Sequence, residues 1–453
     1  MLSRNIGAVR GAHKAATTKP VEKVAKLGNG LTVGTIDSHK PIAHLVLAFR
    51  AGSRYEKANQ AGLSHTIRNF VGRDTQEYFG NTVVWTLSQT GGVLKKCGLI
   101  NLEQNYQIFM SIPKSLTDIA RVMFQKSFTS RDLFGVSLTI PRESTSVGLS
   151  VLGQVAGNPG FKPWEVEDVL PTMRADNGYR TAYDLVVDQI HKAAYRNGGL
   201  GNSIYAPCSK IGSICTSTLS SFAEQHFVTG NGVLFATNAV HDDLLLYGDN
   251  HAPIRSGNAA SPSSSAYKGG EVRRDADSKY AHVIVAGEGA AGNNTKALAT
   301  QAVLLTALGN SSPVKFNTGT TGVIAKAVGQ NGSASAFQAV HADSGLAGVY
   351  LVVEGSQANQ AVSNVVGALK SLKVADIEAV KKQAFNNALR ASAHSDNFAI
   401  ERASQLFQSQ DNYIQQIPNV SASDVEVAAK KLTTKLSLAS YGNVSEVPYV
   451  DTL

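Results

Sequence analysis

The sequence contains few charged residues and no long hydrophobic segment. Charged side chains make up 17% of its 453 residues, below the roughly 25% that is usual for soluble globular proteins. A surface that is partly covered by other subunits would have such a composition, so the low charge favours a protein that works in an assembly. No window offers the roughly 18 to 20 apolar residues of a membrane-spanning helix, and even the apolar run at 43–49 ends at Arg50. Any association with a membrane is therefore expected to come through partners.

Cysteine is also scarce, and its positions exclude two kinds of site. The three residues are Cys97, Cys208 and Cys215. Their number is odd, only the last two lie close together, and no His stands beside them at metal-ligand spacing. We interpret them as reduced thiols, which form neither a disulfide framework nor a zinc site. The chain also lacks G-x-S-x-G, a P-loop and a G-x-G-x-x-G that follows a strand, so the sequence predicts no cofactor and no cofactor-binding residues.

The amino-terminal segment lacks acidic residues. Residues 1–19 contain four basic residues, which are Arg4, Arg10, Lys14 and Lys19. This composition is typical of a mitochondrial transit peptide, whereas a secretory signal needs an apolar run that is missing here. A frayed basic terminus is the alternative. These four residues supply half of the formal net charge of +8, and no basic patch with interleaved aromatics follows, which argues against nucleic-acid binding.

The chain is long enough for two or three domains, and its two halves resemble each other. AHLVLAFRAG at 43–52 is similar to AHVIVAGEGA at 281–290, and in each half a later helix signal precedes another strand. Both helix signals contain the Ser-x-x-Glu pattern of a capping box, in Ser221 with Glu224 and in Ser423 with Glu426. Chance similarity of short Val-, Leu- and Ala-rich strands is the alternative. The expected fold class is α+β, with two similar domains that each contain a mainly antiparallel sheet backed by helices.

Composition suggests where these domains begin and end. Residues 248–266 are rich in Ser, Ala, Gly, Asn and Pro and are expected to form an exposed linker. The predicted domains are residues 20–247 and 267–453, preceded by the transit peptide. Residues 126–152 are rich in Ser and Thr without a sustained helical period, and they form an atypical insertion in this prediction. An ordered surface loop, a flexible insertion and an error in the gene model stay open for that segment.

One segment carries residues of a known catalytic motif. Residues 51–70, AGSRYEKANQAGLSHTIRNF, resemble the pitrilysin-like metallopeptidases, the zincins with an inverted motif. In that family H-x-x-E-H lies on a helix, its two His bind zinc, and its Glu is the general base. This sequence keeps His65 at the first position but has Arg68 in place of the base and Asn69 in place of the second ligand. The third ligand of the family, a Glu on a later helix, aligns near Thr172.

These replacements change the chemistry that the resemblance implies. A guanidinium cannot accept a proton and repels a dication, and an amide is a poor zinc ligand compared with imidazole. The segment therefore predicts a chain that is not an enzyme, with no catalytic and no metal-binding residues. His65 is expected to be a packed, hydrogen-bonded residue at the start of a helix.

Further stretches narrow the resemblance. They are LGNGLTV at 27–33, AGSRYE at 51–56, HKAAYRNGGLGNSIYAP at 191–207, YKGGEVRR at 267–274, HADSGLAGVY at 341–350 and the closing YGNVSEVPYVDTL. Together with the altered motif they are similar to the core subunits of ubiquinol:cytochrome c reductase, complex III of the respiratory chain. The resemblance implies two domains that face each other and a heterodimer with core protein 1 on the matrix side of the mitochondrial inner membrane. It further implies that cytochrome b, the cytochrome c-type subunit and the Rieske protein are partners and carry the redox chemistry.

Two alternatives stay open. One is a subunit of the mitochondrial processing peptidase, which resembles the same fold. The zinc-bearing subunit would need the missing motif, and its presequence-binding partner would need a long glycine run where 307–319 has only Gly309 and Gly319. The other is a peptide-binding cavity between the domains that, with core protein 1, holds or trims a presequence.

Overall fold

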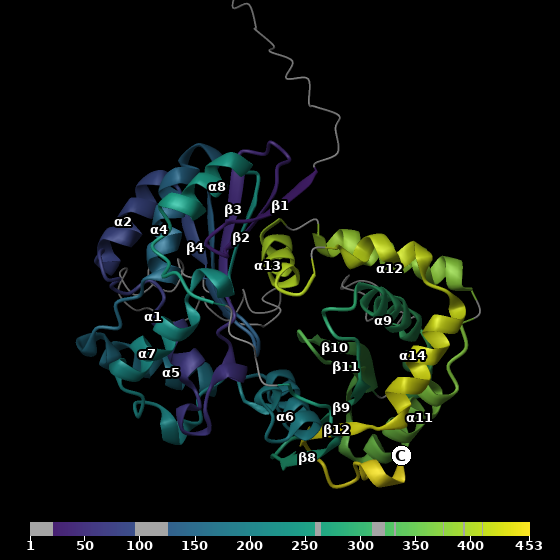
Figure 1. Ribbon diagram of the computed structural model, residues 1–453. Helices are drawn as coiled ribbons and strands as arrows, with labels where there is room; N and C mark the ends of the chain where they lie inside the picture. Colours follow the sequence, from purple (N-terminus) through teal and green to yellow (C-terminus); the bar gives the residue numbers. More distant parts are fainter. Residues whose placement is uncertain are drawn as a thin grey trace, which may run out of the picture.

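The computed structural model describes residues 21–95, 126–258, 264–309, 322–329, 332–374, 376–392, 395–409 and 411–453. Figure 1 shows them as two α+β halves that lie side by side, one coloured purple to teal and the other green to yellow. The predicted transit peptide, Cys97 and most of the stretch 307–319 lie outside the described residues. No helix within the described ranges is long and apolar enough to cross a bilayer.

The first half is built on a seven-stranded sheet. Its strands are β1 (Glu22–Lys26), β2 (Thr32–Ile36), β3 (Ile42–Phe49), β4 (Val93–Lys95), β5 (Lys126–Thr129), β6 (Phe134–Pro141) and β7 (Gly232–Thr237). The order is β1-β2-β7-β3-β6-β4, and β5 pairs with β6. β2 and β7 run parallel, and the other neighbouring strands run antiparallel. β3 lies in the middle, and its residues from position 43 onward are buried.

The second half contains a five-stranded sheet with the same arrangement. Its strands are β8 (Gly270–Asp275), β9 (Tyr280–Glu288), β10 (Gly332–Val340), β11 (Gly345–Glu354) and β12 (Ser437–Gly442), in the order β10-β11-β9-β12-β8. This order corresponds to β4-β6-β3-β7-β2, and the pair β12 and β8 is again the parallel one. The strands that sequence similarity had matched are equivalent, β3 with β9 and β7 with β12. The structure thus confirms the α+β fold and the internal repeat.

Helices cover both sheets. In the first half they are α1 (Leu63–Phe70), α2 (Gly80–Thr90), α4 (Thr145–Gly157), α5 (Val166–Gly178), α6 (Ala182–Tyr195), α7 (Thr216–His226) and α8 (His241–Asn250). In the second half they are α9 (Thr295–Leu308), α10 (Val323–Val328), α11 (Ala358–Lys370), α12 (Ile377–Ser392), α13 (Ser395–Leu406) and α14 (Ala422–Thr434). α4 packs on β3 and β6, whereas α9, α11 and α14 pack on the second sheet.

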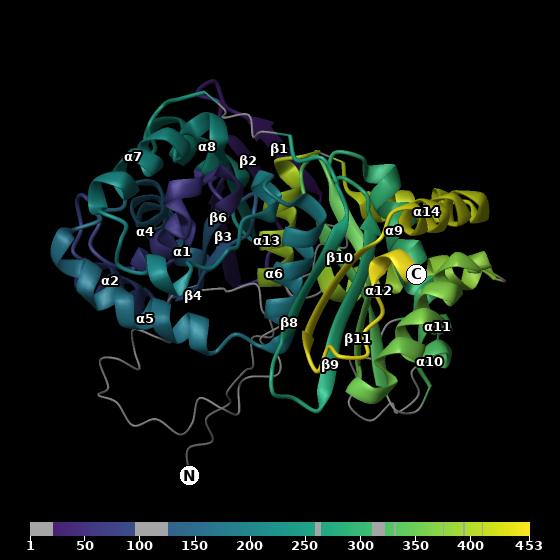
Figure 2. The same ribbon diagram turned by 90° about the horizontal axis from the view of Figure 1, so that it is seen from below.

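The two halves each contribute one helix to the other half's sheet, as Figures 1 and 2 both show. α6 belongs to the first half but packs against β8, β9 and β12, where Val186 and Ile190 contact Ile284. α13 belongs to the second half but packs against β3 and β7, where Ala399 and Ala403 join the core. Because each helix buries apolar residues across the division, the halves form one continuous structure.

Residues 126–152 are not an insertion, so that prediction was wrong. They form β5, β6 and the first part of α4, and β6 pairs with the central strand β3 along its whole length. Val136, Leu138 and Ile140 alternate along β6 and are all fully buried. α4 is buried on more than one side, so its sequence carries no one-sided helical period. Ser137 and Thr139 lie between these apolar residues on the other face of the sheet, which helices also cover. They were mistaken for loop residues.

The predicted linker is more ordered than its composition suggested. Its first three residues, 248–250, belong to α8. Arg255 pairs with Val228, and Ser265 is buried, where its side chain accepts a hydrogen bond from the backbone N–H of Leu200. Small polar residues can satisfy buried backbone groups, so composition alone did not identify an exposed segment.

The predicted capping boxes were also misplaced. Ser221 lies inside α7, which begins at Thr216. α14 does have a capping box, but Ser421 and Asp424 form it, two residues before the predicted pair. The second helix was therefore predicted correctly and its start was not, which is the usual uncertainty at helix ends.

Candidate functional site

The helix that carries the altered motif, α1, is held at its start by a buried carboxylate. The side chain of Glu56 accepts hydrogen bonds from the backbone N–H groups of Gly62 (2.8 Å) and Ser64 (2.7 Å) and from the Ser64 hydroxyl. Gly62 has a φ of 94°, and a Cβ atom there would lie 2.3 Å from the Cβ atom of Ala206, so only glycine fits. Burial raises the pKa of Glu56 to about 7, against the effect of these hydrogen bonds.

Three side chains of α1 converge on one carboxylate of α5. The distances from Asp176 Oδ2 are 3.0 Å to His65 Nε2, 2.6 Å to Arg68 Nη2 and 3.3 Å to Asn69 Nδ2. His65, Arg68 and Asn69 are all buried. The carboxylate of α5 that reaches these side chains is thus Asp176, one helical turn after Thr172, near which the resemblance led us to expect the third ligand position. A carboxylate at i+4 on the same helix face was the signal that could have found it.

The hydrogen bonds of His65 define its protonation. Its Nδ1 atom accepts a hydrogen bond from the backbone N–H of Ala206 at 3.2 Å. Nε2 must then carry the ring proton and donate it to Asp176. Both nitrogens of a neutral imidazole are thus used, whereas a zinc ligand needs one lone pair directed at the metal. The structure confirms that His65 is a buried, hydrogen-bonded residue of the motif helix.

The guanidinium of Arg68 lies among these side chains. Arg68 forms an ion pair with Asp176 and lies 5.4 Å from the centre of the Tyr205 ring. Arg180 approaches the same ring at 4.4 Å, and His65 meets it edge-on at 5.3 Å. These contacts make the motif a packed cluster of cation, carboxylate and aromatic groups. Across the described part of the chain, no three His, Cys, Asp or Glu side chains gather in a way that could hold a metal ion.

A second polar cluster joins the two halves and was not predicted. Arg54, on the 3₁₀ turn Ser53–Tyr55, has a fully buried side chain that bonds to Asp132 at 3.0 Å and to both carboxylate oxygens of Asp343 at 2.6 and 2.7 Å. Asp132 precedes β6 and Asp343 lies in the turn between β10 and β11. Burial acts to raise the pKa of Asp132, but hydrogen bonds from His341 and Arg54 outweigh it and lower the pKa.

This inter-half cluster consists of Arg54, Asp132 and Asp343 together with His341 and His191, which bond to it in series. It borders a cavity of about 280 Å³. Its charged and histidine lining residues are Arg131, Asp184, Asp188, His191 and His341. Tyr205 also lines it and therefore connects the cavity with the motif helix. No local pattern predicted this cluster, because its members come together only when the halves pack.

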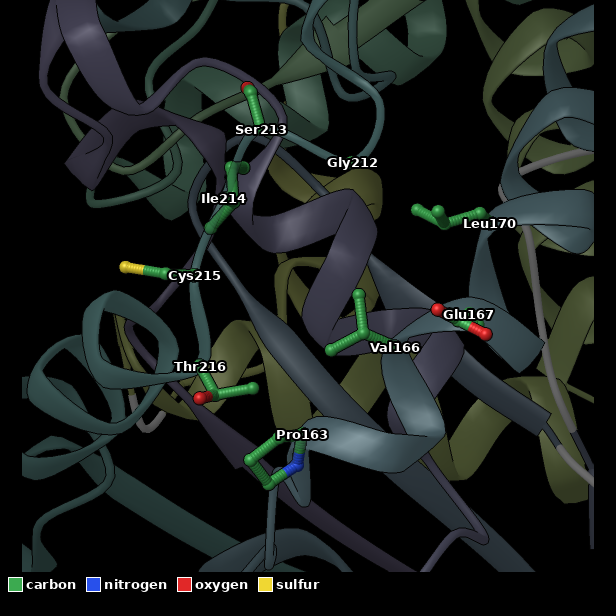
Figure 3. A pocket seen from close by; sticks show the side chains of 9 residues that line it. All are labelled: Pro163, Val166, Glu167, Leu170, Gly212, Ser213, Ile214, Cys215 and Thr216. Atoms are coloured by element: carbon green, nitrogen blue, oxygen red, sulfur yellow. The ribbon is translucent and has the colours of Figure 1, made fainter.

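A third feature is an open pocket of about 450 Å³ between α5 and the start of α7, shown in Figure 3. Cys215 lies on its wall and is exposed. The hydroxyl oxygens of Ser217 and Thr218 each lie 3.0 Å from its Sγ atom. Hydrogen bonds from Ser217 and Thr218 lower the pKa of the Cys215 thiol to about 7. Cys208 is also a free thiol, as the sequence predicted for both.

The chain is similar to known proteins along most of its length. Residues 32–208 match the family described as insulinase (peptidase family M16). The human protein "Cytochrome b-c1 complex subunit 2, mitochondrial" is 26% identical over 94% of this chain and 91% of its own length. The mitochondrial-processing peptidase subunit alpha-2 of Dictyostelium discoideum is 25% identical over 96% and 95%, respectively. The mitochondrial-processing peptidase subunit beta of Saccharomyces cerevisiae is 25% identical over 99% and 98%.

Proposed function

We infer that this chain, a relative of subunit 2 of the mitochondrial cytochrome b-c1 complex with an insulinase-type region of peptidase family M16, is a core subunit of respiratory complex III. In this role it supports electron transfer from ubiquinol to cytochrome c as a structural and assembly component. The similarity to subunit 2 proteins covers 94% of this chain and therefore spans both halves, including α6 and α13, the helices that each half contributes to the other. The subunit corresponds to core protein 2.

The observation that carries the non-catalytic part of this proposal is the cluster on Asp176. A zinc peptidase needs two imidazole lone pairs and a free carboxylate base. Here the imidazole of His65 is committed to hydrogen bonds, Asn69 supplies an amide, and Arg68 supplies a cation. The geometry therefore supports a motif that stabilises the fold in place of hydrolysing peptides.

The proposal extends to partners and location. Core protein 1 is the proposed partner in a heterodimer, with cytochrome b, the cytochrome c-type subunit and the Rieske protein in the same complex. The chain would lie peripherally on the matrix side of the mitochondrial inner membrane, after removal of residues 1–19. The low charge content supports a surface that other subunits cover. The domain limits 20–247 and 267–453, with the segment between them as the connection, belong to the same proposal.

Native electrophoresis of detergent-solubilised mitochondria, with mass spectrometry of the bands, tests the proposal. We expect this chain to migrate with the cytochrome subunits at the size of complex III. A soluble heterodimer of roughly 100 kDa that cleaves presequence peptides would contradict it and would identify a processing-peptidase subunit, the alternative. Cleavage activity that migrates with complex III would instead support a retained presequence cavity.

A further inference from the structure

Two histidines in the inter-half cluster form hydrogen bonds that need one more proton than two neutral rings carry. His191 lies on α6, and His341 lies in the turn between β10 and β11. Both are buried, and their Nε2 atoms are 3.1 Å apart. That is a hydrogen-bond distance, so one of the two nitrogens must donate a proton to the other.

The remaining ring nitrogens already donate. His191 Nδ1 is 2.7 Å from the carbonyl oxygen of Val187, which can only accept. His341 Nδ1 is 3.0 Å from Oδ2 of Asp132, a carboxylate oxygen that also accepts a hydrogen bond from the backbone N–H of Ala342. Both Nδ1 atoms therefore carry protons. If both rings were neutral, two Nε2 lone pairs would point at each other inside the protein, which is unfavourable.

The surroundings decide which ring holds the additional proton. Burial lowers the pKa of His191 well below its usual value, and the guanidinium of Arg131 acts in the same direction. His341 instead contacts the carboxylate of Asp132. We propose that His341 is an imidazolium that donates Nδ1–H to Asp132 and Nε2–H to His191, so that a bound proton joins the two halves.

The charges around the pair do not oppose this cation. Among the described residues, charged and titratable groups from five segments surround the pair. They include Arg54 on the first 3₁₀ turn, Arg131 and Asp132 before β6, Arg180, Tyr183, Asp184, Asp188 and Tyr195 on and before α6, Tyr205 after it, and Asp343 beside His341. The three guanidiniums pair with three of the carboxylates, Asp132, Asp188 and Asp343. Asp184 adds a negative charge on the cavity wall. One imidazolium therefore balances the cluster.

A metal ion is the competing explanation for two Nε2 atoms that face each other. A bound metal would need further ligands, and none of the described residues supplies a third His, Cys, Asp or Glu in a suitable position. Arg131 also places a positive charge close to His191. A proton needs only the two nitrogens, so it fits where a metal does not.

The proposal gives the additional proton a place in the contact between the halves. The contact between His191 and His341 is favourable while that proton is bound, because without it two lone pairs would face each other between the halves. The exchanged helices and Arg54 join the halves independently of this proton.

Nuclear magnetic resonance of the full chain with ¹⁵N-labelled histidine tests the proton directly. Ring nitrogen shifts distinguish an imidazolium from each neutral tautomer, and His191→Gln and His341→Gln assign the signals. At pH 7.5 we expect His341 to have both nitrogens protonated and His191 to be neutral with its proton on Nδ1. Two neutral rings at that pH, or a stoichiometric metal that a chelator removes with a change in both signals, would overturn the proposal.

His282→Gln is the matched control for these variants, since His282 pairs with Tyr350 at 2.7 Å outside this cluster. It should leave the ring nitrogen signals of His191 and His341 unchanged. The resonance measurement on the wild type decides if a variant does not fold.

Discussion

Two buried histidines in this molecule each contact an aspartate, yet their hydrogen bonds make one ring neutral and the other positively charged. His65 accepts a backbone N–H at Nδ1 and donates from Nε2 to Asp176, so it is neutral. His341 faces acceptors at both nitrogens, the Asp132 carboxylate and the His191 ring, and it needs two protons. Neither burial nor a neighbouring carboxylate distinguishes the two. The group that faces the second ring nitrogen does.

The two sites also differ in how they balance the aspartate charge. At Asp176 the positive charge is the guanidinium of Arg68, a permanent cation. At Asp132 the guanidinium of Arg54 is supplemented by the additional proton that we propose on His341. The charge of the motif cluster is therefore fixed by the chain, whereas the charge of the inter-half cluster depends on a bound proton.

The first way to break this comparison is to return the motif to metal-binding chemistry. In Arg68→Glu with Asn69→His, a second imidazole and a carboxylate replace the cation and the amide beside His65 and Asp176. We expect zinc bound after dialysis to change from none in the wild type to about one ion per chain, because the ligand set of the family is restored. Elemental analysis by mass spectrometry measures the zinc content.

The matched control for this change is Arg68→Gln alone. It removes the repelling cation without adding a ligand and should leave the zinc content unchanged. Stoichiometric zinc in the wild-type chain would contradict the comparison, because His65 would then have a lone pair available for metal.

The second way is to remove the permanent cation from the motif cluster. Arg68→Met keeps an apolar side chain of similar length but leaves the charge of Asp176 without its guanidinium, and we expect a loss of about 3 kcal/mol in the free energy of unfolding. Urea unfolding measures the loss. Arg73→Met is the control, since Arg73 forms an exposed pair with Asp168 that should contribute less than about 1 kcal/mol. Equal losses in the two variants would show that Arg68 acts as a surface charge.

The sequence predicted some of these features and not others, for physical reasons that differ. The repeat was visible because β3 and β9 are central strands, whose side chains are apolar along most of their length. The altered motif was visible because its residues are neighbours on one helix. Asp176 was not predicted, because the third ligand position was expected near Thr172 and the alignment had no anchor after an unrecognised strand.

The inter-half cluster could not have been predicted in the same way. His191 and His341 are separated by 150 residues in sequence. Each opens a stretch that carried the resemblance, at 191–207 and at 341–350, but nothing in either stretch links one histidine to the other. Their contact depends on how α6 packs across the second sheet, which is a tertiary arrangement that periodicity does not encode. Residues 126–152 were misread for a different reason. The alternation of Val136, Leu138 and Ile140 with polar residues was a strand signal, but the many Ser and Thr residues of the segment were taken as loop residues.

The third test uses Glu56, a buried carboxyl group that has hydrogen-bond donors but no cation. Burial raises its pKa to about 7, above the value of roughly 4.3 in an unfolded chain. A carboxyl group with a raised pKa favours folding when it is protonated, so stability should fall as the pH rises from about 4.5 to about 7. We expect this fall to be on the order of 2 kcal/mol larger in the wild type than in Glu56→Gln.

Unfolding in urea at several pH values checks this difference. Glu165→Gln serves as the control for a buried carboxyl group elsewhere, because burial also raises the pKa of Glu165, which accepts a hydrogen bond from the backbone N–H of Asp74 outside the motif helix. The explanation fails if wild type and Glu56→Gln lose stability in parallel over this range. The hydrogen bonds from the backbone N–H groups of Gly62 and Ser64 would then outweigh the effect of burial on the pKa of Glu56. In the same way, the hydrogen bond from the N–H of Ala206 determines the protonation of His65.

The smallest expected effect isolates hydrogen bonding from burial altogether. Cys215 is exposed, and hydrogen bonds from Ser217 and Thr218 lower the pKa of its thiol to about 7. Because only the thiolate reacts with iodoacetamide, the alkylation rate at Cys215 should reach half of its maximum near pH 7. In Ser217→Ala with Thr218→Val the midpoint should move to higher pH, and the rate at pH 7 should fall several-fold. Mass spectrometry of the alkylated peptide separates Cys215 from Cys97 and Cys208. An unchanged midpoint would mean that the start of α7 stabilises the thiolate without the hydroxyls. Hydrogen-bond partners would then set the charge of the buried histidines but not the charge of this exposed thiol.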